Sequence, residues 1–569
     1  MDSVTTIERA RLDTAPEPVD APPSGPLPTV TVLASALALA ACGESGGSTG
    51  GGTGPIVGPP PAPAPLTAAE SSRFLGQATM GATRTTVDAL IARGIDGWLT
   101  DQFALPRATT HWDWLIANGY DAATNINSQT GFDPTMWRQL IVEPDQLRQR
   151  VGMALLDMIV VGINGVNLNW VAFAAAAYVD VLLDNAFGNF RDIMDKITTN
   201  AAMASFLTFL GNRKANVTTG AVPDENYARE LMQLFTLGLY KLNMDGSVQT
   251  SAGVPLETYT QADVTQLARV FTGLNLANTT STTPDRYRLP LIMTTSQNET
   301  GSATFLGVTV SGGGFAAIKT ALDTIFAHSN MPPFVSKQLI QRLVTSNPSP
   351  AYISRVATIF ANNGSGVRGD MKAVIRAILT DTEARGSDAL TSATAGKLRE
   401  PILRLTGWAR AFGVNSPSNA WGIGDTSSQT NRLGQSPGRS PTVFNYFRPG
   451  YSPPSTQISS LGLVAPEFQI TNEQSVVAYI NYFQTLVASG TGDTKPDYTA
   501  ILTKAADSNA LVAEVNTVLA AGQLSPATVS TIAAAVESVS YTATTNGPIN
   551  RVGIAILLTL ASPEYLTVR

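Results

Sequence analysis

Three carboxylates in two expected helices could perform acid–base chemistry. Glu225 and Glu230 lie near the start of the first helix, where either could act as a general acid or ligate a metal ion. Asp263 lies in the first turn of the second helix, three residues after Thr260. This spacing is that of a capping box, in which each side chain bonds the main chain of the other residue. A helix cap is therefore the structural alternative for Asp263.

Charge pairing offers a structural explanation for the glutamates as well. Glu225 and Arg229 are four residues apart on one helix face and can form an ion pair. Arg213 and Arg269 are further bases that could complete a buried Arg–Glu network. We favour this explanation over catalysis, because structural ion-pair networks also gather charged residues. The same three arginines are candidate ligand-binding residues.

Aromatic side chains gather in one short segment, residues 443–451. Four of them surround Arg448: Phe444, Tyr446, Phe447 and Tyr451. The segment could line a groove for a glycan, because it places aromatic faces beside polar groups. The alternative, which we favour, is a loop held in the core by its aromatic rings, since such rings bury large areas.

Composition excludes several kinds of site. The chain has one cysteine, Cys42, and two histidines, His111 and His328. A disulfide within the chain is excluded, and so is a structural zinc site, which takes about four Cys or His ligands. We expect no metal and no cofactor. A Ser-His-Asp triad would have to use His111 or His328, and we favour a solvent-exposed or helix-capping role for each.

The charge pattern excludes nucleic acid as a partner. The formal net charge is −6, and no dense run of Lys or Arg occurs. Nucleic-acid binding normally requires a concentrated basic patch that neutralises phosphates. We therefore expect no nucleic acid among the partners of this protein.

The N-terminal residues have the pattern of an exported lipoprotein. Residues 29–41 are apolar and end at Cys42, and this length suits a signal peptide better than a membrane span of about 20 residues. The four residues that end at Cys42 match the lipobox of bacterial lipoproteins, which makes Cys42 the lipid attachment site. We expect a signal peptide over 1–41 and a Gly/Pro-rich tether over 42–66. Because Gly43 carries no aspartate retention signal, we expect delivery to the outer membrane, facing the periplasm or the cell surface.

Two observations bear on this assignment. Residues 1–28 are acidic overall, whereas signal peptides open with positive charge, and an over-extended start would account for the difference. A small cysteine buried in a core helix is the alternative role for Cys42. A flexible tether would not follow a core helix, so we favour the lipid anchor.

Helical periodicity dominates residues 67–569, so we expect a mainly α fold: one large multi-helix body with a few short strands or hairpins and long loops. Thr67 and Glu70 have the spacing of a capping box that opens this domain. Residues 304–310 are the best strand candidate, and 170–179 should form a buried helix. The expected helices are 144–158, 180–210, 224–240, 260–272, 315–327, 333–344, 352–361, 371–380, 397–412 and the stretch from 550; 276–303 and 413–470 are expected to be rich in loops.

A family resemblance is carried by residues 211–216 with 223–231, 259–273, 397–401 and 443–451. In order and content they resemble the bacterial family named domain of unknown function 1800, from about residue 70 to the C-terminus. The resemblance implies a mostly helical exported protein, often encoded beside a second exported protein of unknown function. It also implies histidines at two positions where this chain has Val222 and Asn298, which argues against a histidine-based mechanism.

Two functions remain as expectations. The first is a non-enzymatic envelope module, tethered to the membrane by its lipid, that binds an exported partner protein or a glycan. The second is a hydrolase or lyase that uses Glu225, Glu230 and Asp263 on an extracytoplasmic polymer. Two of these carboxylates about 5–10 Å apart and open to a pocket beside residues 444–451 would favour the enzyme. Carboxylates sealed by arginines would count against it.

Overall fold

The computed structural model describes residues 65–278, 282–542 and 545–569. The predicted signal peptide, Cys42 and nearly all of the predicted tether lie outside these residues. The described part contains 25 α-helices and four two-stranded antiparallel β-pairs, which confirms the mainly α fold class. The first helix begins at Ala68, behind the predicted capping box: Thr67 accepts from the Glu70 amide, and the Glu70 carboxylate accepts from the Thr67 amide.

Three stretches of chain build the body. The first contains α1 (Ala68–Ala78), α2 (Arg84–Arg93), α3 (Ile95–Ala104), α4 (His111–Ala117), η1 (Ala123–Asn125), α5 (Phe132–Val142), α6 (Gln146–Met158), η2 (Ile163–Gly165), α7 (Val171–Asp184), α8 (Phe190–Thr198) and α9 (Ala201–Phe206). The second contains α10 (Asn226–Glu230), η3 (Leu231–Thr236), β1 (Thr250–Ser251), β2 (Val254–Pro255), α11 (Gln261–Val270), β3 (Leu274–Asn275), η4 (Asp285–Tyr287), β4 (Ile292–Met293), β5 (Ala303–Phe305), β6 (Val308–Val310), α12 (Gly314–Ala327), α13 (Met331–Leu343), α14 (Pro350–Ala361), α15 (Met371–Thr380), α16 (Thr382–Arg385), α17 (Asp388–Thr391) and β7 (Lys397–Leu398). The third contains α18 (Pro401–Ala411), α19 (Gln457–Ser460), η5 (Pro466–Ile470), α20 (Glu473–Ser489), α21 (Thr499–Leu502), α22 (Ser508–Ala520), α23 (Pro526–Glu537), α24 (Gly547–Ala561), α25 (Pro563–Leu566) and β8 (Thr567–Val568).

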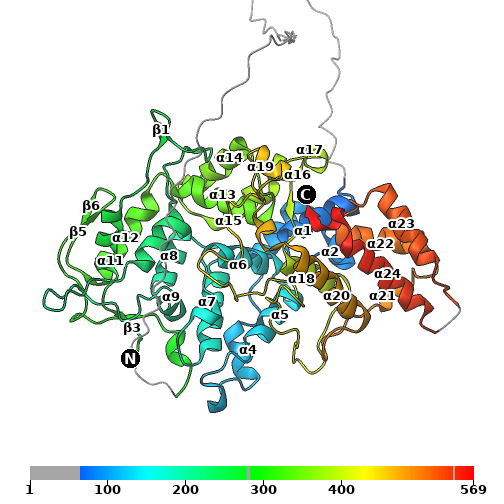
Figure 1. The fold of residues 1–569 in the computed structure, drawn as a ribbon, viewed down its shortest axis with the longest axis horizontal. Helices are drawn as coiled ribbons and strands as arrows, with labels where there is room; N and C mark the ends of the chain where they lie inside the picture. The colour runs from blue at the N-terminus through cyan, green and yellow to red at the C-terminus, as the bar shows by residue number, and fades with distance from the viewer. Residues whose placement is uncertain (1–64, 279–281, 543–544) are drawn as a thin grey trace, which may run out of the picture. The chain divides into compact units, whose positions relative to one another are not determined.

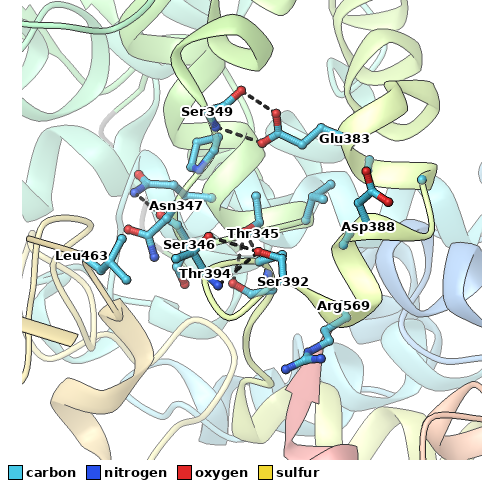
Figure 2. Close-up of a pocket in the computed structure, with 18 of the residues that line it drawn as sticks. Thr345, Ser346, Asn347, Ser349, Glu383, Asp388, Ser392, Thr394, Leu463 and Arg569 are labelled. Atoms are coloured by element: carbon cyan, nitrogen blue, oxygen red, sulfur yellow. Dashed lines mark hydrogen bonds between the residues drawn. The ribbon is translucent and has the colours of Figure 1, made fainter. Parts of the chain in front are cut away.

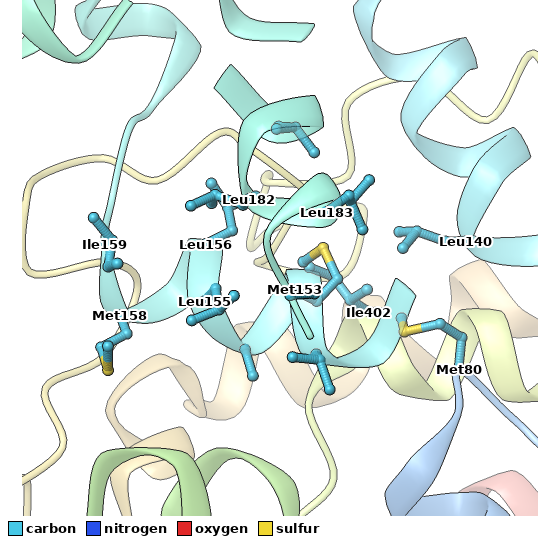
Figure 3. Packing of buried hydrophobic residues seen from close by; sticks show 14 of the residues in the cluster. Met80, Leu140, Met153, Leu155, Leu156, Met158, Ile159, Leu182, Leu183 and Ile402 are labelled. Atoms are coloured by element: carbon cyan, nitrogen blue, oxygen red, sulfur yellow. The ribbon is translucent and has the colours of Figure 1, made fainter. Parts of the chain in front are cut away.

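The core is centred on α6 and α7, which pack against each other. Figure 3 shows Met153, Leu155 and Leu156 of α6 facing Leu182 and Leu183 of α7. α7 is apolar around most of its circumference and almost wholly buried, which confirms the buried helix predicted over 170–179. Within the described ranges, no helix combines the length and the apolar character needed to cross a bilayer.

Two groups of neighbouring helices stand beside this core. α13 packs on α14, and α14 packs on α15 (Figure 1). α22, α23 and α24 pack on one another, and α22 also contacts α1 near the start of the body. β7 pairs with β8, with Lys397 opposite Val568, so the C-terminal strand returns to the middle of the chain.

The predicted helix over 180–210 was wrong in its continuity, because the structure divides it into the end of α7, α8 and α9. Asn189 and Asn200 cap α8 and α9, and each side-chain oxygen accepts from main-chain amides of the following turn. Asparagine at these positions satisfies a helix start and therefore ends the preceding helix. The hairpin predicted over 304–310 is confirmed as β5 and β6.

Candidate binding pocket

A pocket of about 870 Å³ opens between α13, α14 and the segment from α16 to β7. Its wall is rich in hydroxyl, amide and charged groups, several of which are labelled in Figure 2. The loop 344–349, which connects α13 to α14, forms one side. Gln77 of α1 and Leu463 of the loop before η5 contribute from distant parts of the chain. Sites for small ligands are commonly concave and of this size.

Two hydrogen-bonded junctions hold the pocket walls in place. Ser349 caps α14, and its amide and hydroxyl donate to the two carboxylate oxygens of Glu383, at 2.9 and 2.5 Å (Figure 2). Arg73 of α1 donates to the main-chain oxygens of Ala384, Gly386 and Arg569 at 2.9–3.2 Å. α1, α14, α16 and the C-terminal strand are thereby fixed around one cavity.

Two buried polar side chains in the wall have no hydrogen-bond partner among the described residues. Gln77 is 1% exposed, and within the described residues neither its amide nitrogen nor its amide oxygen makes a hydrogen bond. The same holds for the hydroxyl of Ser346, which is 3% exposed. A buried polar group without a partner costs about 1–3 kcal/mol, so each one calls for an explanation. The described residues hold others away from this pocket, Gln139 of α5 among them. Both residues line the cavity, although their unpartnered polar atoms are themselves closed off from solvent.

Lys337 of α13 adds a positive charge to the same wall. Its side chain is half-buried, and burial lowers the pKa of its ammonium group. In the part of the chain that the structure describes, no carboxylate forms an ion pair with Lys337, and no acceptor receives a hydrogen bond from it. The other basic wall residues are Arg73, Arg355 and Arg569. Arg73 donates to main-chain oxygens, Arg355 pairs with Asp381 at 2.7 Å, and Arg569 donates to the main-chain oxygen of Leu390. Among the described basic residues of the wall, Lys337 is therefore the one without a hydrogen-bond partner.

A buried ionic cluster surrounds Lys397, which belongs to one of the stretches that carry the family resemblance. Lys397 is 4% exposed and donates to Glu400 at 3.1 Å, to Glu467 at 2.9 Å and to the main-chain oxygen of Arg342 at 2.9 Å. Burial acts to raise the pKa of Glu400, but Lys397 and Arg150 outweigh it and lower that pKa. For Glu467 burial prevails and the pKa is raised. The cluster stabilises the contact between β7 and η5.

The segment 443–451 docks on α6 beside this cluster. Asn445 has a left-handed backbone, with φ of 61°, and its amide donates to Asp157 at 2.8 Å. Burial and the charge of Glu400 raise the pKa of Asp157 to about 7. Tyr446 donates its hydroxyl to the main-chain oxygen of Arg439 at 2.8 Å. The middle of the segment is thus held in the interior.

The remaining predicted residues of this segment are more accessible. Phe444 is 37% exposed, and the guanidinium of Arg448 stacks on its ring at 4.7 Å. Tyr451 is half-buried. Neither aromatic ring lines the 870 Å³ pocket. The segment therefore combines a core plug, formed by its middle residues, with a small exposed cation–aromatic pair.

Glu225 is surrounded by donors. Arg229 pairs with it at 2.9 Å, the amide of Gln261 donates at 2.7 Å and the hydroxyl of Thr265 donates at 2.6 Å. The expected partners Arg213 and Arg269 are placed elsewhere: Arg213 is exposed, and Arg269 pairs with Glu299 at 3.6 Å. The helix-face pairing of Glu225 and Arg229 is confirmed, and the wider network with Arg213 or Arg269 was wrong, because the loop 211–216 carries Arg213 into solvent.

Glu230 and Asp263 occupy contrasting surroundings. Asp263 completes the predicted capping box with Thr260 and also accepts from the amide of Leu306 at 2.8 Å. Glu230 is 7% exposed and has one oxygen without a partner among the described residues, and burial raises its pKa to about 7. It directly precedes the π-helical turn η3, a kind of turn that is frequent at functional sites. None of the three predicted carboxylates lines the pocket.

The two histidines differ in role. The ring of His111 is buried and bonds Asp180 at 2.8 Å, which contradicts the solvent-exposed or helix-capping role expected for it. His328 is the C-terminal cap residue of α12, as expected, and its ring nitrogen accepts from the amide of Asn330. Over the described ranges, no group of three His, Cys, Asp or Glu side chains is arranged to hold a metal ion.

Sequence reasoning missed Gln77, Lys337 and Ser346. One signal was present for Gln77, which lies beside Phe74, Leu75 and Ala78 on the buried face of an amphipathic helix. A polar residue on such a face needs a partner. For the other two residues, nothing in the local sequence indicated that the chain would fold a cavity around them.

Comparison with known proteins gives one match. The family model described as "Protein of unknown function (DUF1800)" matches residues 73–567, a range that includes Gln77, Lys337 and Ser346. No curated protein and no solved structure matches the chain. The match covers most of the chain and all four stretches that carried the resemblance, and so the chain belongs to the DUF1800 family.

Proposed function

We propose that the protein is a binding protein and that its ligand is a segment of a partner polypeptide, held in the pocket between α13, α14 and α16. One observation carries the proposal: Gln77 and Ser346 line an 870 Å³ cavity, and among the described residues the amide of the first and the hydroxyl of the second have no hydrogen-bond partner. A ligand toward which these side chains rotate would remove the cost of burying them unsatisfied.

The chemistry of the wall favours a polypeptide over a glycan. Each peptide unit supplies one N–H donor and one C=O acceptor, which match the acceptor and donor of the Gln77 amide. The lining residues include no aromatic ring. A flat aromatic face, on which a sugar ring would stack, is therefore missing from this wall, and a glycan would have to rely on hydrogen bonds alone.

We place this binding in the bacterial cell envelope, with the body tethered by a lipid on Cys42 and an exported protein as the partner. The support is the lipobox that ends at Cys42 and the Gly/Pro-rich stretch after it. Mass spectrometry of the protein purified from its membrane should find an acylated Cys42 as the first residue. Recovery of the unprocessed N-terminus without acyl chains would contradict the placement.

The binding proposal is tested by selecting peptides from a random displayed library on the full chain. Selected peptides should bind with an affinity that falls about tenfold in Gln77→Met, because one donor and one acceptor, worth roughly 1–2 kcal/mol, are lost. Thr394→Trp, at an exposed position of the wall, should block binding by filling the cavity.

Gln139 of α5 provides the matched control. It is also fully buried with both amide atoms unpartnered among the described residues, but it does not line the pocket. Gln139→Met should therefore leave peptide affinity unchanged. Peptides that bind Thr394→Trp and Gln77→Met as tightly as the wild type would overturn the proposal. An oligosaccharide that binds with the same dependence on Gln77, where no peptide does, would replace the polypeptide by a glycan.

A further inference from the structure

An apolar recess of about 260 Å³ adjoins the pocket. The chain after η3 supplies Leu239, Tyr240 and Val248, and α13 supplies Phe334. The first three side chains are 49%, 43% and 43% exposed, although each is large and apolar or aromatic. Apolar side chains gathered around a concave site, rather than scattered singly, are typical of a surface that a ligand covers.

The recess and the pocket share one wall. Lys337, Gln341 and Val464 line both cavities. Gln341 is already used, because its amide donates to the main-chain oxygens of Ser346 at 3.0 Å and Pro449 at 3.4 Å. Lys337 has no such partner within the described ranges, so a free ammonium group stands at the junction between a polar and an apolar cavity.

We propose that the bound segment carries a large apolar side chain and, near it, a carboxylate: the apolar side chain fills the recess and the carboxylate pairs with Lys337. This inference rests on the polypeptide-binding function proposed above and adds the chemistry of the partner. Charge complementarity supports this pairing, because an ammonium group half-removed from water gains from an anion that enters with the ligand. The lowered pKa of Lys337 agrees with this, since burial without a counter-charge is its cause.

The size of the recess fits one side chain. A cavity of about 150 Å³ accommodates benzene, so 260 Å³ is sufficient for a Leu, Met or Phe side chain. Side chains two residues apart in an extended segment lie on the same face, about 6.6 Å apart, which keeps an acidic residue at that spacing within reach of the shared wall. The partner is thus expected to present an acidic residue two positions from a large apolar one.

The test compares peptides selected on the wild type with those selected on Lys337→Met. Selection on the wild type should enrich peptides with Asp or Glu two positions from Leu, Met or Phe. On Lys337→Met the apolar preference should persist and the acidic preference should disappear. Lys504→Met, which removes a lysine that lines a different cavity, should give the wild-type result.

Binding constants then isolate the pair. For one selected peptide, changing its acidic residue to the amide should weaken binding about tenfold or more to the wild type and less than about twofold to Lys337→Met, as a direct charge-assisted contact requires. Equal affinities of the acid and amide peptides for the wild type would overturn this inference. If peptide affinity still fell in Gln77→Met, the proposed binding function would survive that result. If peptide affinity also stayed the same in Gln77→Met and in Thr394→Trp, both the inference about the partner and the proposed binding function would be overturned. Displacement of the peptide by an unlabelled second copy of this chain would identify that copy as the occupant and overturn the inference of a separate partner.

Discussion

Replacing Glu230 by glutamine keeps the shape of a buried side chain and removes its charge. Glu230 is 7% exposed, and its Oε2 has no hydrogen-bond partner in the described part of the chain. Burial raises the pKa of its carboxyl group from 4.5 to about 7, although Arg229 acts in the opposite direction. The folded protein therefore disfavours the ionised form, which the unfolded chain accepts freely. Glu230→Gln should remove this penalty.

The magnitude follows from the pKa values of the two states. A rise from 4.5 to about 7, at about 1.4 kcal/mol per pKa unit, corresponds to roughly 3 kcal/mol, and screening by nearby solvent reduces this to about 2 kcal/mol. Because the folded pKa is raised, the stabilising contribution of Glu230 is complete below about pH 4.5 and is lost as pH rises through about 7. The glutamine variant should equal the wild type near pH 4.5 and exceed its free energy of unfolding by about 2 kcal/mol at pH 8.5.

Thermal unfolding followed by circular dichroism measures the difference. For a body of about 500 residues, 1 kcal/mol shifts the midpoint by roughly 1 °C, so Glu230→Gln should unfold about 2 °C higher than the wild type at pH 8.5 and at the same temperature near pH 4.5. Glu225→Gln is the control on the same helix start: it loses charge-assisted bonds from Arg229, Gln261 and Thr265 and should unfold lower. A midpoint for Glu230→Gln at or below that of the wild type at pH 8.5 would refute the reasoning.

Two further predictions concern the positions that hold the fold. Lys397→Met leaves Glu400 and Glu467 buried without their counter-charge and should lower the free energy of unfolding by about 3–5 kcal/mol. The control Lys319→Met, at an exposed ion pair, should change that free energy by less than about 1 kcal/mol. Similar losses for the two variants in denaturant unfolding would contradict a buried ionic role for Lys397. Thr260→Ala removes the side-chain cap of α11 and should lower the free energy of unfolding by about 1 kcal/mol in the same assay. Thr260→Ser keeps the hydroxyl and should retain most of the stability. An equal loss in both variants would show that the hydroxyl is not the stabilising group.

Local patterns were sufficient to predict much of the helical framework. The capping boxes at Thr67 and Thr260, the pair Glu225–Arg229 and the hairpin over 304–310 depend on residues within a few positions of one another. Such interactions form with little help from the rest of the fold, so sequence spacing predicts them. The same spacing did not predict α20, α22 and α23, whose apolar residues alternate with Ser, Thr and Asn and gain their helical state from packing on α24 and α1.

The candidate site, by contrast, was decided by tertiary structure. Gln77, Lys337 and Ser346 come from α1, from α13 and from the loop after α13. Only Gln77 has a local signal, its place on the buried face of α1, and nothing in the neighbours of Lys337 and Ser346 distinguishes those two from ordinary surface residues. Packing of α1 against the end of the chain, and of α16 against α14, brings them into the wall of one cavity. Whether a polar group lacks a partner depends on every segment that surrounds it, and sequence spacing describes only one of those segments.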